Sequence, residues 1–419
     1  MLIRVRIDPR VIYAFMILTL GVNAAVFCIC WKQIMGGKND FPVFYSNAQM
    51  VHEGQASRLY DVEAENSFVR RVSDGDRAPN NHLPYELLIF LPFARLRFGA
   101  AYMLWTLLGL AMLGGVAQLT RNIWPAESRF GPIFLAILAF FPVWYCLLQG
   151  QDSILLLFLF ALSFWLWRQR REDAAGFVLA LGLFRPQLVL PFVLVTFLGG
   201  KWRFVRGFVP GAALVSLLSL QVVGIHGMTD YARILMLQGT QGSARTLAEQ
   251  WQVRPGLMPT LRGLLWIVLP SSATTRIRSL LLLSVTLAAL LWTARRMRSA
   301  RDEATFNLIF ALAVTVVTLV SFHSFIHDFS LMILPLLTAA SGLAWSEPIT
   351  ETRAYSIVTV AFLFFLTPLY LVLLFTDKVG LFVLPTVAFL WLMSSWRMGS
   401  LGALSARRSP AEPTPILPV

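Results

Sequence analysis

The stretch Asn39-Asp40-Phe41-Pro42-Val43-Phe44-Tyr45 follows the first long apolar run and opens the longest polar excursion of the chain, which continues to Arg58-Leu59-Tyr60-Asp61. Asp40 is a residue type that favours a helix start, and a proline at position 42 is tolerated in the first helical turn. Apolar residues recur on one face of the following segment, which predicts a short helix at the membrane surface that stops near Gly54. Asp40 either caps this helix or does chemistry.

The composition sets the class of protein. Apolar residues make up 57% of the chain and charged residues 14%, and several apolar runs reach the roughly 18 residues that cross a bilayer. The net charge of +13 would suggest nucleic acid in a soluble protein. Here the basic residues lie between apolar runs, where they set topology and meet anionic lipid headgroups. The sequence therefore predicts an all-α polytopic membrane protein without a nucleic-acid partner.

Basic clusters alternate along the chain and predict its topology. The arginines before the first span, with no small-residue cleavage site after it, indicate an uncleaved anchor whose N-terminus is cytoplasmic. We expect a first outer loop over residues 34–83 and a second over 225–256. About 10–12 transmembrane helices, with short re-entrant or interfacial pieces, would form one domain over residues 1–400. Residues 401–419 are rich in proline and small residues and are expected to form a disordered cytoplasmic tail.

One region departs from simple spans. Residues 174–184 and 188–198 are two apolar arms around Arg185-Pro186, and basic residues flank both outer ends. Each arm reaches about 17 Å at helical rise, roughly half of the hydrocarbon thickness. The charges favour a hairpin that enters from the inner side, with Arg185 at its tip. A single continuous span fits the length but would place Lys201 outside.

Polar residues stranded near membrane depth gather on the predicted outer side. Ionisable groups there are expensive, so such a cluster points to a functional site. Taken singly, each has a plainer explanation: Asp40 and Asp152 can cap helices, and the histidines can satisfy loop carbonyls. The set on the outer side comprises Asp40, His52, Asp61, His82, Glu86, Gln149, Gln151, Asp152, His226, His323, His327 and Asp328.

Several of these residues lie in segments that together resemble glycosyltransferase family 87. The acidic residue after the first span precedes Tyr45, Gly54 and Leu59-Tyr60-Asp61, and Gly150-Gln151 stands at an outer turn. Phe184-Arg185-Pro186-Gln187 stands where the family more often has Lys-Pro. The segment Ser321-Phe322-His323-Ser324-Phe325-Ile326-His327-Asp328 is similar to a late histidine motif, with Phe322 in place of an expected proline.

The resemblance implies a type C glycosyltransferase fold and a transfer with inversion. The donor would be a polyprenyl-phosphate sugar, with mannose as the sugar, and the acceptor a lipid-linked or cell-envelope glycan. The reaction would occur at the outer, periplasmic face of the plasma (inner) membrane. Under this interpretation Asp40 is the general base, and the substrate-binding residues are His327, Asp328, Tyr45, Tyr60, Gln151 and Arg185.

The donor's leaving phosphate needs a cation, which Arg185, Arg254 or Arg262 could supply. No acidic pair has convincing metal spacing, so we expect neither a metal nor a cofactor. Two other classes stay open. A lipid or glycan transporter or flippase would also use broken helices, but needs a midplane site reachable from both sides. A glycan polymerase or ligase would share the site and differ in its donor.

Overall fold

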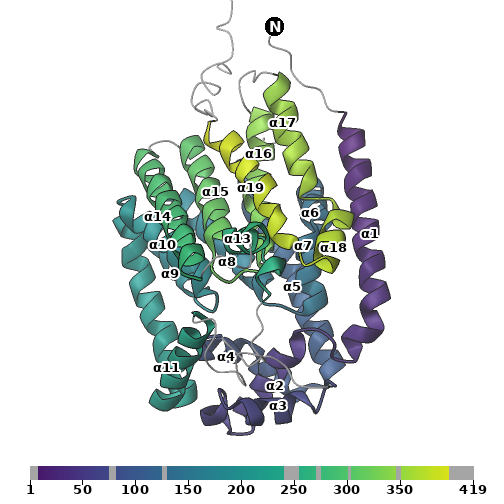
Figure 1. Ribbon diagram of the computed structural model, residues 1–419, viewed down its shortest axis with the longest axis vertical. Coiled ribbons are helices and arrows are strands. Elements are labelled where there is room, and N and C mark those ends of the chain that lie inside the picture. Colours follow the sequence, from purple (N-terminus) through teal and green to yellow (C-terminus); the bar gives the residue numbers. More distant parts are fainter. Residues whose placement is uncertain are drawn as a thin grey trace, which may run out of the picture.

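The computed structural model describes residues 8–74, 82–124, 130–239, 254–269, 275–300, 303–345 and 351–395. Every regular element in these ranges is a helix, so the predicted all-α polytopic membrane fold is confirmed. The long helices run roughly parallel to one another, and a set of short helices closes one end of the bundle (Figure 1). The predicted tail over residues 401–419 lies outside the described residues.

Four helices in the described ranges are long and apolar enough to cross a membrane, by length and composition. Two bent pairs raise that number to six if each pair is one span, with bends of 66° and 53°. The four long helices are α1 (Pro9–Met35), α5 (Phe98–Thr120), α11 (Trp202–Gly239) and α14 (Thr275–Ser299). The bent pairs are α6 (Phe130–Ala139) with α7 (Phe141–Gln149), and α17 (Glu351–Leu363) with α18 (Thr367–Phe375).

The remaining helices are shorter, and the 10–12 spans expected from the sequence count several of them as crossings. The apolar ones that build the bundle interior are α8 (Ser153–Arg168), α9 (Glu172–Ala180), α10 (Pro186–Leu198), α15 (Glu303–Val320), α16 (Ile333–Trp345) and α19 (Val383–Ser394). The short α13 (Leu261–Val268) lies beside them. The 3-10 turn η6 (Asp328–Met332) leads into α16.

α9 and α10 form the expected hairpin. Its two basic flanks meet the same end of the bundle: Lys201 Nζ donates to the carbonyl of Ala300 at 3.3 Å, and Arg168 pairs with Glu303. Arg185 is the residue before α10 and lies at the opposite end of both arms. Lys201 and Arg168 therefore share one end, which a continuous span from α9 through α10 would not allow.

Small residues let α9 and α11 approach closely. A Cβ at Gly176 would lie 1.9 Å from the carbonyl oxygen of Phe204, and one at Gly207 would lie 1.8 Å from that of Asp173. Backbone contact of this kind is how membrane helices pack where apolar side chains give no net drive to associate. The glycines therefore fix the hairpin against α11.

The predicted second outer loop over residues 225–256 begins as a helix in the structure, and its location outside the membrane stays a prediction. The element α11 consists of two helical segments that meet in a kink at Gly224, a non-helical residue with φ 69°, and the second segment ends at Gly239. Glycine adopts a positive φ without the penalty of a side chain, so the chain can change direction there. Residues 240–253 of the predicted loop lie outside the described residues.

The polar segment after α1 forms the set of short helices at the closed end (Figure 1). It contains the predicted surface helix as α2 (Phe41–His52), followed by η1 (Ala56–Arg58) and α3 (Val62–Val69). Next come η2 (Pro84–Glu86), α4 (Leu87–Phe90) and η3 (Leu91–Arg95). Phe41 and Phe44 of α2 pack their rings against Phe90, which joins the two segments into one layer.

Opposite ends of the bundle should lie on opposite sides of the membrane. We expect a cysteine introduced at Ser57 in η1 to react with an impermeant maleimide added outside, and one at Ser299 at the end of α14 to react only after the membrane is opened. Both positions are exposed, and the alternating basic clusters set the direction. Labelling of Ser57→Cys from the inner side alone would overturn the topology.

Candidate functional site

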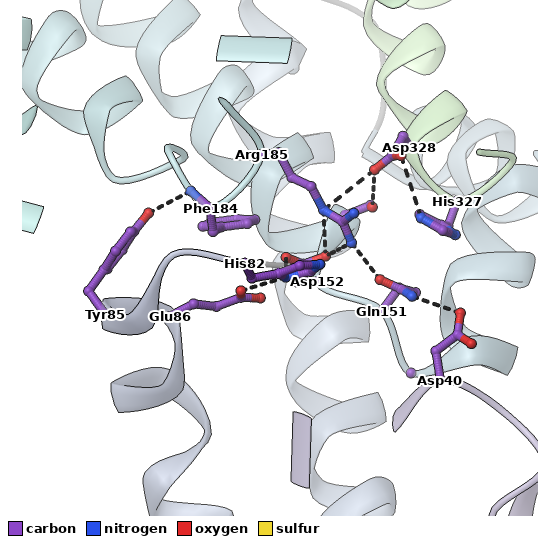
Figure 2. A network of polar contacts seen from close by, with 12 residues as sticks. Asp40, His82, Tyr85, Glu86, Gln151, Asp152, Phe184, Arg185, His327 and Asp328 are labelled. Atoms are coloured by element: carbon purple, nitrogen blue, oxygen red, sulfur yellow. Dashed lines mark hydrogen bonds and ion pairs between the residues drawn. The ribbon is translucent and has the colours of Figure 1, made fainter. Parts of the chain in front are cut away.

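Arg185 is the centre of a buried polar network (Figure 2). The residue is 4% exposed, and its Nε donates to Asp152 Oδ1 at 3.0 Å. Nη2 donates to the same oxygen and to Gln151 Oε1, the latter at 2.5 Å. Asp328 Oδ1 lies 3.6 Å from Nε. One guanidinium thus joins the tip of the α9–α10 hairpin to the α7–α8 turn and to η6.

Asp328 is held from two further directions. Ser153 Oγ donates to Asp328 Oδ1 at 2.8 Å, and the backbone N–H of Phe325 donates to Oδ2 at 3.1 Å. The second bond closes the loop that precedes η6. Asp328 therefore has fixed partners on both oxygens, which suits a residue that organises the site.

Asp40 lies at the edge of this network and is partly exposed. Gln151 Nε2 donates to Asp40 Oδ2 at 2.7 Å, so Gln151 bridges Asp40 to Arg185. Although Asp40 precedes α2, its side chain makes no capping hydrogen bond to that helix. The helix start therefore does not account for this carboxylate.

The α7–α8 turn that carries Gln151 and Asp152 depends on Gly150. Gly150 ends α7 in the left-handed conformation, with φ 64°. A Cβ there would also lie 2.6 Å from the Cβ of Phe41. A side chain at position 150 would thus strain the backbone and push against the start of α2. The glycine lets the turn and Asp40 approach each other.

His82 and Glu86 form a second part of the network; the sequence placed both in the outer polar set but gave neither a specific role. His82 Nδ1 lies 2.5 Å from Glu86 Oε2 and 3.7 Å from Asp152 Oδ2. Burial lowers the pKa of His82 to about 4 and raises the pKa of Glu86 to about 7.

Tyr85 ties this loop to the hairpin. Its hydroxyl donates to the carbonyl of Leu181 at 2.9 Å and accepts from the N–H of Phe184 at 2.9 Å. Both groups belong to the hairpin tip, where the helical hydrogen-bond pattern is broken. A side chain from η2 therefore satisfies backbone groups that would otherwise be unpaired in a buried place.

The other predicted substrate-binding residues take different positions. His327 is 5% exposed, and its Nε2 lies 3.5 Å from Asp328 Oδ2. Neither of its ring nitrogens has a hydrogen-bond partner among the described residues. Tyr45 points away from the network, because its hydroxyl donates to the carbonyl of Leu96 at 2.6 Å. Tyr60 donates to the carbonyl of His82 at 2.9 Å and supports the second part of the network.

Other polar residues from the predicted outer set have local roles. Asp61 caps α3, accepting from the backbone N–H groups of Glu63 and Ala64, and it pairs with Arg58. His52 and His226 are exposed. His323 is partly exposed and packs edge-on against Phe325, with ring centroids 5.0 Å apart.

Comparison with known proteins identifies the family. The pattern of Glycosyltransferase family 87 matches residues 84–321, which is more than half of the chain, so the chain belongs to this family. It is a multi-pass membrane glycosyltransferase. No curated protein and no solved structure matches the chain. Within the match lie Glu86, Asp152 and Arg185, whereas Asp40 precedes it and Asp328 follows it.

Removing the charge of Arg185 should lower the stability of the folded protein. Arg185→Gln leaves Asp152 and Asp328 buried without their cation, and breaking a buried pair from one side costs about 3–5 kcal/mol. We expect a large fall in melting temperature in detergent. The control is Arg206→Gln, which breaks the exposed pair with Asp173 and should change stability by less than about 1 kcal/mol. Equal melting temperatures for both variants would contradict the assignment.

Proposed function

We propose that this membrane glycosyltransferase moves mannose from a polyprenyl-phosphate donor to a lipid-linked or cell-envelope glycan, with inversion at the anomeric carbon. The reaction would take place at the outer face of the plasma (inner) membrane. The observation that carries the proposal is the position of Asp40. Its carboxylate is partly exposed, makes no helix-capping hydrogen bond and lies at the edge of the buried network.

In the proposed reaction Asp40 takes the proton of the acceptor hydroxyl. The acceptor oxygen then bonds to the anomeric carbon as the bond from that carbon to the phosphate oxygen breaks. The polyprenyl phosphate leaves with the electron pair of that bond. A general base must hold its orientation through this step, and the hydrogen bond from Gln151 Nε2 to Asp40 Oδ2 provides one fixed contact. It leaves Oδ1 to meet the acceptor.

The leaving phosphate needs a cation, and the structure changes the order of the candidates. Arg185 is engaged by Asp152, Asp328 and Gln151, so its charge is already balanced by carboxylates. Arg254 lies 3.7 Å from the carboxylate of Asp377. We therefore favour Arg262.

Arg262 belongs to α13 and is fixed against the late histidine motif. Its Nη1 donates to the carbonyl of Phe322 at 3.0 Å, and its guanidinium stacks 4.0 Å from the centroid of the Phe322 ring. Among the described residues no carboxylate pairs with it. Planar contact of this kind orients a guanidinium while leaving its other N–H groups to meet phosphate oxygens.

Asp40→Asn should lower turnover by about 100-fold or more, the usual scale for loss of a general base. The substitution keeps size and can still accept the hydrogen bond from Gln151, so the melting temperature should change little. The assay incubates the purified protein with polyprenyl-phosphate mannose and a membrane glycolipid extract, and reads products by mass spectrometry.

Asp61→Asn provides the matched control. It changes a carboxylate on the same polar segment, and asparagine caps a helix about as well as aspartate. We expect near-normal turnover in Asp61→Asn. Near-normal turnover in a folded Asp40→Asn protein would remove Asp40 as the base.

Arg262→Gln should weaken donor use, with a rise of about tenfold or more in the KM for the polyprenyl-phosphate donor and a smaller change in the KM for the acceptor. Charge-assisted contacts of about 1.5–3 kcal/mol set this scale. Arg262→Lys should keep part of the donor affinity, because the charge remains. Arg254→Gln is the comparison at an arginine that is already paired with a carboxylate. Unchanged donor kinetics in Arg262→Gln would exclude the contact.

A further inference from the structure

The buried network carries more carboxylates than its one arginine can balance. Glu86, Asp152 and Asp328 are each 0% exposed, and Arg185 is the guanidinium that reaches this group within the described residues. A buried carboxylate without a counterion is strongly unfavourable. A bound cation, a protonated His82 or a proton shared between carboxyl groups would supply the missing positive charge.

The uncompensated charge lies on one side of Asp152. Its Oδ1 accepts from Arg185, whereas Oδ2 turns toward His82, 3.7 Å from Nδ1. The buried Asp152 Oδ2 and Glu86 Oε1 have no N–H or hydroxyl donor among the described residues. The two carboxyl groups lie within hydrogen-bond reach of each other, a contact that needs a proton or a cation between them. Arg185 is engaged by other oxygens, so these two oxygen atoms are available to a bound cation.

Geometry agrees with a metal ion at this place. His82, Glu86 and Asp152 each offer one ligand atom, and the three atoms lie within 4.8 Å of one another. Ligands bound to one metal at about 2.1 Å are separated by about 3–4 Å. Small side-chain rotations would bring the three atoms to such distances.

The surroundings hold the three side chains in place. Arg185 fixes Asp152, and the hydroxyl of Tyr60 donates to the carbonyl of His82. The ring of Phe44 packs edge-on against the His82 imidazole, with centroids 5.3 Å apart. Supporting contacts of this kind orient ligands before a metal binds.

We infer that His82, Glu86 and Asp152 bind one divalent metal ion. One imidazole nitrogen with two carboxylate oxygens suits a transition ion such as Mn²⁺ or Zn²⁺ better than Ca²⁺ or Mg²⁺. Three protein ligands leave further coordination positions for water or another oxygen ligand. From the sequence we expected no metal, because no acidic pair has metal-ligand spacing. The three ligands proposed here come from a loop and from a turn that is distant in the sequence.

The test uses the full-length protein in lipid nanodiscs, stripped with EDTA and titrated with Mn²⁺. Electron paramagnetic resonance should show uptake of one equivalent, and pulsed spectra of the bound ion should show ¹⁴N coupling from the His82 imidazole. This measurement needs no variant. A folded protein that binds no Mn²⁺, or binds it without nitrogen coupling, would overturn the inference.

Variants then locate the ion. Glu86→Gln and His82→Gln should weaken Mn²⁺ binding by about tenfold or more, because loss even of outer contacts costs 10–100-fold. Glu63→Gln, at an exposed carboxylate of α3, should bind like the unchanged protein.

The rival explanation has its own signature. If Glu86 and Asp152 share a proton instead, infrared spectra should show a protonated carboxyl band that persists in saturating Mn²⁺ and disappears in Glu86→Gln, and this outcome would contradict the metal site. None of these readouts depends on glycosyl transfer, so the metal site and the proposed function can fail separately.

Discussion

The ion pairing of Arg185 is the constraint on which the centre of this molecule depends. A buried guanidinium needs carboxylate partners, and those of Arg185 come from the α7–α8 turn and from η6. Three segments far apart in the sequence are thereby held at one point. These contacts fix the depth of the hairpin tip. They also fix the α7–α8 turn, whose Gln151 holds Asp40 in position.

Hydropathy and charge predicted much of the fold because both act on long segments. The surface helix after α1, the hairpin around Arg185 and the all-α class follow from apolar run lengths and from the side on which basic residues gather. The second helical segment of α11 did not follow, because one glycine with a positive φ redirects the chain without changing the local hydropathy. Among the described residues, five helices of 10–17 residues are apolar but short, and the predicted 10–12 spans include several of them.

At the site, sequence identified residue types and missed pairings. Asp40, Gln151, Arg185 and Asp328 were singled out, and the structure joins them in one network. That Arg185 serves carboxylates could not be read from the chain, because its partners lie 33 and 143 positions away along the sequence. Tyr45 was assigned to substrate, yet its hydroxyl donates to the carbonyl of Leu96, just after η3, a contact that depends on tertiary packing.

The hydroxyl of Tyr85 also bears on how such a protein is made. The tip of the α9–α10 hairpin exposes a carbonyl and an N–H that lipid cannot satisfy, and Tyr85 meets both. Tyr85 precedes the hairpin in the chain, so it is synthesised before the two backbone groups that its hydroxyl binds. The hairpin tip can therefore lie in a buried place without two unpaired backbone groups only when the η2 segment is docked beside it.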